Sequence, residues 1–164
     1  MNGGVLVAGI GNIFLGDDGF GVEVVSRLRQ KTLPSYVRVV DFGIRSYDLA
    51  YALMENWGLV ILVDALPRGG EPGTLYTIEP ELGDDTDEIT VDAHTMNPAA
   101  VLQLVRALGG RPSRMLVVGC EPATVNPDST GTFALSAPVS AAVDEAVYMI
   151  EGLINRARAE ASAA

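Results

Sequence analysis

The chain has 164 residues, of which 48% are hydrophobic and 20% charged, and its formal net charge is -10 at pH 7. A chain of this size builds one domain with a core that needs no disulfide or structural metal, so we expect a single domain over residues 1–164. The negative charge would repel a nucleic-acid backbone, and no apolar run approaches the roughly 20 residues that span a bilayer, so neither nucleic acid nor a membrane is an expected partner.

Residues 5–10 are apolar, and no basic region precedes them. This beginning predicts no export signal. With a single cysteine, which cannot form an internal disulfide, the sequence predicts a cytoplasmic protein.

Short β-branched runs alternate with segments of helical period. This alternation is the pattern of a mostly parallel sheet covered by helices on both faces. Continuous apolar runs predict four core strands, at residues 5–8, 37–40, 59–63 and 115–118, and the partly alternating residues 73–78 predict an edge strand that runs antiparallel. The predicted fold is α/β, a three-layer α/β/α sandwich around a five-stranded, mostly parallel twisted sheet.

Two helices are predicted in the first half of the chain. The first starts near Asp18 and ends before Pro34, and it directs an apolar face toward the sheet. That face consists of Val22, Val25 and Leu28. The second helix starts at Ser46, as its N-cap, and runs to about Asn56.

Two further helices are predicted in the second half. The third has Asn97 as its cap and Pro98 as its first residue. The last starts at Ser136, and we expect it to fray beyond Arg158. Its buried stripe repeats at spacings of four and three, at Val139, Val143, Val147, Ile150 and Ile154.

Polar and glycine-rich residues follow three of the predicted core strands. They are the loop at residues 9–19, Asp64, and residues 119–122. In open α/β sheets, sites form outside the carboxyl ends of the strands, because the loops converge there. We therefore expect the functional site at this edge.

The first of these loops is not a dinucleotide-binding loop. The third glycine of the G-x-G-x-x-G pattern would fall on Phe14, and two carboxylates stand at the helix start where a pyrophosphate would bind. The loop suits a carboxylate presented in a tight turn, because glycines allow a positive φ or a close approach of the backbone.

Two carboxylates and one imidazole are candidates for a site. Aspartate is among the commonest N-caps, and the sequence leaves open whether Asp17 or Asp18 is the functional one. Asp64 directly follows a buried strand, where desolvation of a carboxylate is costly unless a cation or a donor is near. His94, the only histidine, is as consistent with packing as with a ligand.

The motifs together resemble one known family. They are Gly9-Ile10-Gly11-Asn12, Asp17-Asp18-Gly19-Phe20-Gly21-Val22, Asp41 to Gly43, Val63-Asp64-Ala65, and His94. Along almost the whole chain this set resembles the nickel-iron hydrogenase maturation proteases. The resemblance implies an α/β sandwich of five strands and an endopeptidase that removes a short carboxyl-terminal extension from the hydrogenase large-subunit precursor after nickel insertion.

The resemblance also implies a site. Matched position by position, the metal-recognition and catalytic residues of the family fall on Asp18, Asp64 and His94. We expect Ni²⁺ to arrive with the precursor, no organic cofactor, and a monomeric protein. The chain departs from many relatives after Asp41, where they have two or three glycines, so Phe42 and Arg45 are candidates for an altered substrate preference.

Other chemistries have less support. The chain has no G-x-S-x-G elbow and no H-E-x-x-H helix, which disfavours serine and zinc-helix peptidases. Cys120 is an alternative ligand or nucleophile, but free cysteine is commonly a small buried apolar residue. The competing function class is a binding module, either a nickel carrier that uses the same three ligands or a flavodoxin-like protein that binds a small ligand in the first loop.

Overall fold

The computed structural model describes residues 3–80, 98–123 and 134–163. Its strands form one sheet in the order β2-β1-β3-β5-β4. They are β1 (Gly4–Ile10), β2 (Val37–Gly43), β3 (Trp57–Ala65), β4 (Leu75–Ile78) and β5 (Met115–Cys120). The first three and β5 pair in parallel, and β4 pairs antiparallel to β5 at one edge, so the predicted mostly parallel sheet with an antiparallel edge strand is confirmed.

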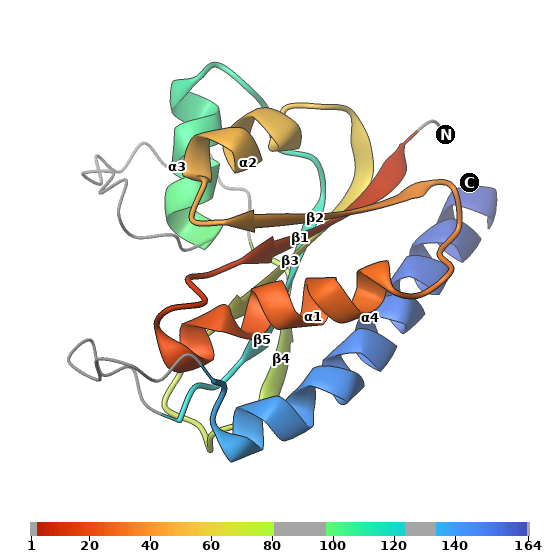
Figure 1. The fold of residues 1–164 in the computed structure, drawn as a ribbon. Helices are drawn as coiled ribbons and strands as arrows, with labels where there is room; N and C mark the ends of the chain where they lie inside the picture. The colour runs from red at the N-terminus through yellow and green to blue at the C-terminus, as the bar shows by residue number, and fades with distance from the viewer. Residues whose placement is uncertain (1–2, 81–97, 124–133, 164) are drawn as a thin grey trace.

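Helices cover both faces of the sheet (Figure 1). They are the 3-10 helix η1 (Gly16–Gly19) and the α-helices α1 (Phe20–Arg29), α2 (Ser46–Leu53), α3 (Pro98–Ala107) and α4 (Ala137–Ala163). One apolar cluster lies between the sheet and α1 with α4, and a second lies between the sheet and α2 with α3. The predicted α/β/α sandwich is therefore confirmed. No helix in the described ranges has an apolar stretch long enough to span a membrane.

The first half of the chain differs from the predicted elements in four respects. Residues 37–40 are part of a strand, β2, as predicted, but β2 is the other edge of the sheet and not a core strand, and only its Phe42 is buried. α1 begins at Phe20, because η1 takes up the two aspartates before it. Its buried face includes Phe20 and Val24, whereas Val22 is only half-buried. Ser46 is the first residue of α2 and not its cap.

The second half agrees more closely. Pro98 is the first residue of α3, as predicted, and the predicted cap Asn97 lies outside the described residues. All five residues of the predicted stripe on α4 are buried. The helix does not fray beyond Arg158 but continues to Ala163, because Arg158 lies 5.0 Å from the ring centre of Tyr36 and Glu160 pairs with Arg114 at 2.9 Å.

Glycines allow α1 to lie very close to the ends of two strands. A Cβ at Gly21 would overlap the carbonyl oxygen of Val63 and lie 2.5 Å from that of Ile10. Across the same contact, a Cβ at Gly9 would lie 2.6 Å from the carbonyl oxygen of Gly21. This close approach brings η1, which precedes α1, beside the carboxyl end of β3.

Gly21→Ala is expected to lower the free energy of unfolding by about 3 kcal/mol, because the added methyl group meets backbone atoms that cannot move aside easily. The measurement is urea unfolding followed by circular dichroism. Gly152→Ala is the matched control: nothing lies within 4 Å of the added atom, so it is expected to stabilise α4 by about 0.5 kcal/mol. Equal stabilities of the two variants would contradict the close contact.

Candidate active site

The carboxyl ends of three neighbouring strands meet at one edge of the sheet. β3 lies between β1 and β5, and all three run parallel. Asp64 is the penultimate residue of β3 and lies opposite Gly119 of β5. The first loop, which leads from β1 into η1, lies at the same edge (Figure 1). We predicted that the polar residues after these strands lie together at the carboxyl end of the sheet, and the structure confirms it.

Hydrogen bonds within the first loop and to the end of β2 hold this loop in place. The backbone N–H of Asn12 donates to Oδ2 of Asp18 over 2.8 Å. Gly11 has φ +137°, and a Cβ there would overlap the carbonyl oxygen of Asp18. The same glycine donates its N–H to the carbonyl oxygen of Gly43 over 3.0 Å. These contacts hold the Asp18 carboxylate in one position at the end of the sheet.

Asp17 has a structural role. Its side chain is buried, and both oxygens accept hydrogen bonds from residues far along the chain. Oδ2 accepts from the N–H of Ala123 and from the hydroxyl of Ser136, each over 2.9 Å, and Oδ1 accepts from the N–H of Ser136 over 2.7 Å. Asp17 therefore ties η1 to the end of β5 and to the start of α4. Within the described residues, Asp18 accepts a side-chain hydrogen bond only from Asn12.

Asp64 is buried beside another negative charge. Its side chain is 4% exposed. Burial raises the pKa of its carboxyl group well above the usual value, the charge of Asp18 raises it further, and only the N–H of Ala65 acts in the opposite direction. No lysine or arginine in the described part of the chain forms an ion pair with Asp64. Two carboxylates without a nearby cation are an arrangement that a metal ion would stabilise.

The structure brings two of the three predicted site residues together. The charges of Asp18 and Asp64 are close enough to influence each other. His94 lies outside the described residues, so its place relative to them is not given. Within residues 3–80, 98–123 and 134–163, no group of three ligating side chains that could hold a metal ion occurs. The Asp18 and Asp64 pair therefore supplies at most part of a ligand set.

Several proteins that are similar to this chain in sequence or in fold are named hydrogenase maturation proteases. The family model described as hydrogenase maturation protease matches residues 22–153. The chain belongs to this family. A Methanocaldococcus jannaschii protein, assigned by its name to hydrogenase maturation proteases, is 35% identical over 93% of this chain and 97% of its own length. The hydrogenase 2 maturation protease of Escherichia coli is 27% identical over 96% of this chain and 94% of its own length.

Solved structures of the family have the same fold. The hydrogenase maturating endopeptidase HybD of Escherichia coli superposes with a TM-score of 0.72 and 27% identity over 93% of both chains. The hydrogenase maturation protease HycI of Thermococcus kodakarensis gives 0.66 and 25% identity over 93% of this chain and 92% of its own. Since these family members are proteases and endopeptidases, this chain is a peptidase.

Cys120 of this peptidase is not an activated thiol. The side chain is fully buried at the end of β5. Burial raises the pKa of the Cys120 thiol to about 11, with further contributions from the charges of Asp17 and Glu121. A thiol in this state is protonated at neutral pH and is a poor nucleophile. The structure thus favours the packing role that the sequence also favoured.

A buried glutamate that the sequence analysis did not single out holds the turn between β3 and β4. Glu121 accepts hydrogen bonds from the N–H groups of Arg68, at 2.7 Å, and Gly69, at 3.0 Å, and from the hydroxyl of Tyr76, at 3.0 Å. The N–H of Arg68 is the largest cause that lowers the pKa of this carboxyl group. The sequence signal for this role was a glutamate directly after an apolar strand. Its hydrogen-bond partners could not be found from the local sequence, because they lie some 50 residues earlier.

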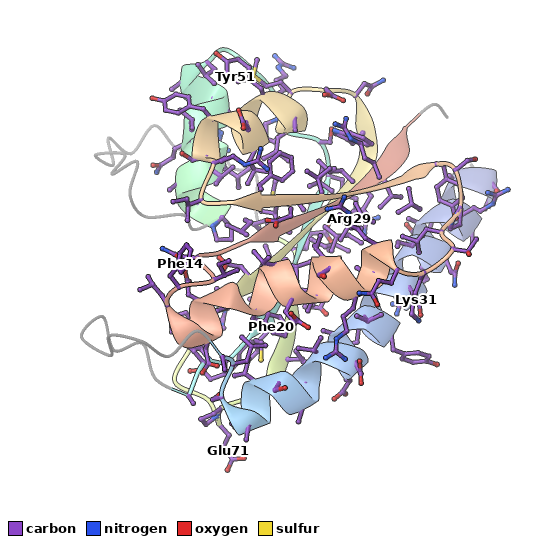
Figure 2. The ribbon with its side chains drawn as sticks, viewed as in Figure 1. Phe14, Phe20, Arg29, Lys31, Tyr51 and Glu71 are labelled. Carbon is purple, nitrogen blue, oxygen red and sulfur yellow. The ribbon has the colours of Figure 1, made fainter. Side chains whose placement is uncertain are left out.

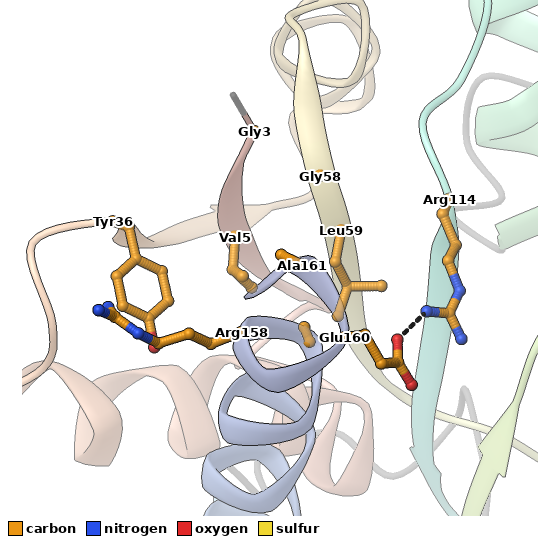
Figure 3. Close-up of a pocket in the computed structure, with 10 residues that line it drawn as sticks. Gly3, Val5, Tyr36, Gly58, Leu59, Arg114, Arg158, Glu160 and Ala161 are labelled. Atoms are coloured by element: carbon orange, nitrogen blue, oxygen red, sulfur yellow. Dashed lines mark hydrogen bonds and ion pairs between the residues drawn. The ribbon is translucent and has the colours of Figure 1, made fainter. Parts of the chain in front are cut away.

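A separate hollow of about 400 Å³ lies at the opposite end of the sheet, beside the carboxyl-terminal part of α4 (Figure 3). Gly3, Gly58, Tyr36 and Arg158 are among its lining residues. Its charged groups already have partners, because Glu160 pairs with Arg114 and the Arg158 guanidinium stacks on Tyr36. This hollow is therefore no competitor to the carboxyl edge as the candidate active site.

In the metal-free protein, the free energy of unfolding of Asp18→Asn is expected to rise relative to that of wild type as the pH increases from about 4 through the raised pKa of Asp64. In wild type, the folded state keeps a proton on Asp64 that the unfolded chain has lost, so stability falls with rising pH in this range. Removing the Asp18 charge lowers the pKa of Asp64 and so reduces this loss. The measurement is urea unfolding at several pH values in the presence of a chelator.

Asp17→Asn is the matched comparison in the same experiment. It is expected to lose about 3 kcal/mol across the range, because a single amide oxygen cannot accept all the hydrogen bonds that reach the carboxylate. Identical pH profiles for wild type and Asp18→Asn would contradict the interaction between Asp18 and Asp64.

Proposed function

We propose that the protein is an endopeptidase that removes the carboxyl-terminal extension of a nickel-iron hydrogenase large-subunit precursor after nickel has been inserted. Membership of the hydrogenase maturation protease family supports the reaction class. The observation that carries the proposal is the pair of Asp18 and Asp64, in which a buried carboxylate with a raised pKa lies beside a second carboxylate and has no cationic partner within the described residues. This pair has the charge and the donor atoms to receive a divalent cation.

The nickel ion in this proposal belongs to the substrate and is not a resident cofactor. Asp18, Asp64 and His94 would bind it together, since carboxylate oxygen and imidazole nitrogen are both suitable donors for Ni²⁺. Asp64 would lose its proton as the cation replaces the water that burial has removed. Three protein ligands leave coordination positions for groups of the precursor.

The protein's own residues then act by placement. A bound metal ion can polarise a peptide carbonyl or activate water. The hydrogen bond from Asn12 fixes the Asp18 carboxylate, and the burial of Asp64 excludes water from the second carboxylate. A precursor that carries nickel is positioned with its scissile bond at this edge, and a precursor without nickel is not. Cleavage would thereby depend on completed metal insertion.

The proposal places the reaction in the cytoplasm and assigns it to a monomer. A chain with one cysteine forms no internal disulfide, which suits a reducing compartment.

The decisive experiment is cleavage of the precursor, with and without nickel, followed by mass spectrometry of its carboxyl terminus. Wild type is expected to cleave only the nickel-loaded precursor. Asp64→Asn and His94→Ala are expected to lower the rate by at least about 100-fold, because each removes a ligand of the substrate's metal. Asp144→Asn is the matched control, since this carboxylate is 82% exposed on the surface of α4 and is expected to leave the rate unchanged.

Two results would contradict the proposal in different ways. Equal cleavage of nickel-free and nickel-loaded precursor would overturn nickel recognition and leave the peptidase. No cleavage of a precursor verified as loaded, together with saturable nickel binding by the protein alone, would favour the carrier function.

Cys120→Ser is expected to retain the cleavage rate of wild type within about twofold, because the buried, protonated thiol takes no part in the reaction. The rate is measured on the nickel-loaded precursor, and circular dichroism verifies the fold. A folded variant that has lost turnover would point to a thiol mechanism instead.

A further inference from the structure

Large apolar side chains are exposed around the candidate active site. Three of them are consecutive in the first loop, where Ile13 is 49%, Phe14 63% and Leu15 52% exposed. Two more follow β2, where Ile44 is 62% and Tyr47 55% exposed. We name these five residues the apolar rim. Three consecutive exposed apolar residues are unfavourable in a soluble protein unless they have a function.

None of the five rim residues belongs to either apolar core cluster. Phe20, six residues after Phe14, is fully buried between α1 and the sheet. Figure 2 shows Phe14 at the carboxyl edge of the sheet, outside the packed layers.

Hydrogen bonds hold the rim in place. In the first loop, the side-chain oxygen of Asn12 accepts from the N–H of Phe14 over 2.9 Å, and its backbone oxygen accepts from the N–H of Leu15 over 3.1 Å. The bond from Gly11 to Gly43 joins this loop to the segment that carries Ile44. A braced loop loses little backbone freedom when a partner covers it, which favours binding.

A hollow of about 420 Å³ adjoins the rim. Ile13 lines it together with Val22, Leu135 and the glycines of η1. Val22 is only half-buried because it faces this hollow and not the sheet. The rim thus offers both projecting apolar side chains and a depression beside them, the combination typical of a protein interface.

We propose that the apolar rim is the docking surface for the folded large-subunit precursor, which contacts it through apolar side chains next to its carboxyl-terminal extension. This inference rests on the proposed function, because it assigns the same substrate to the rim. The rim is continuous with the site: the Asn12 residue that braces Phe14 also donates its N–H to the Asp18 carboxylate. A partner seated on the rim has its extension beside Asp18 and Asp64.

The charges near the rim favour an apolar partner surface. The first loop has no charged residue between Asn12 and Gly16. Beside Ile44, Arg45 and Asp48 pair with each other at 3.3 Å. Glu23, which also lines the hollow, pairs with Arg27 at 3.3 Å. The rim segments themselves therefore present no isolated charge for steering, and affinity is expected to come from apolar burial, with aromatic residues as anchors.

The test measures binding and cleavage separately on the nickel-loaded precursor. Phe14→Ser, Leu15→Ser and Ile44→Ser are each expected to raise the dissociation constant, by at least about 10-fold for Phe14→Ser, while the melting temperature is unchanged because the replaced side chains are exposed. Tyr148→Ser is the matched control: it removes an aromatic side chain that is 78% exposed on α4, away from the rim, and is expected to bind like wild type.

The outcomes separate the two proposals. Unchanged affinity in all three rim variants, or no binding of the precursor by wild type, overturns docking at the rim, whatever the cleavage result. Rim-dependent binding without cleavage supports docking and contradicts the proposed peptidase reaction on this substrate. If sedimentation shows that wild type self-associates and that Phe14→Ser is monomeric with unchanged affinity for the precursor, a second copy of this chain occupies the rim and the proposal is wrong.

Discussion

Removal of a carboxylate from water is costly unless hydrogen bonds or a cation compensate for the lost hydration. Three carboxylates are buried at the carboxyl end of this sheet, those of Asp17, Asp64 and Glu121. Asp17 and Glu121 are compensated by backbone N–H groups and hydroxyls. For Asp64 only the N–H of Ala65 lowers the pKa, and burial together with the charge of Asp18 keeps the pKa raised. The two fully compensated carboxylates hold the loops, and the incompletely compensated one has the properties of a functional group.

The arrangement of the loops follows from the same hydrogen bonds. Asp17 joins η1 to the segments on either side of the connection between β5 and α4, and Glu121 holds the turn before β4. The glycine contact between α1 and the ends of β1 and β3 sets the distance between these loops and the sheet. The position of Asp18 beside Asp64 therefore depends on contacts of residues that have no chemical role themselves.

The two proposals divide recognition between two kinds of interaction. Carboxylates are suited to distinguish a metal-loaded substrate from a metal-free one, because their affinity depends on the charge of the bound cation. Exposed apolar side chains are suited to read the shape of a folded surface, because their affinity depends on buried area. Asn12 contributes to both, since its N–H holds Asp18 and its side chain holds Phe14.

The sequence by itself determined the sheet, the antiparallel edge strand, the buried stripe of α4, the family resemblance, and Asp64 as a candidate, because these depend on local periodicity and on residues that directly follow strands. It did not distinguish Asp17 from Asp18. Only the tertiary structure gave Asp17 its structural role, because its donors Ala123 and Ser136 lie 106 and 119 residues away. The fold likewise decided the edge position of β2, the role of Glu121 and the exposure of Phe14. Strand order, long-range hydrogen bonds and solvent exposure all depend on neighbours in space, which the local sequence does not specify.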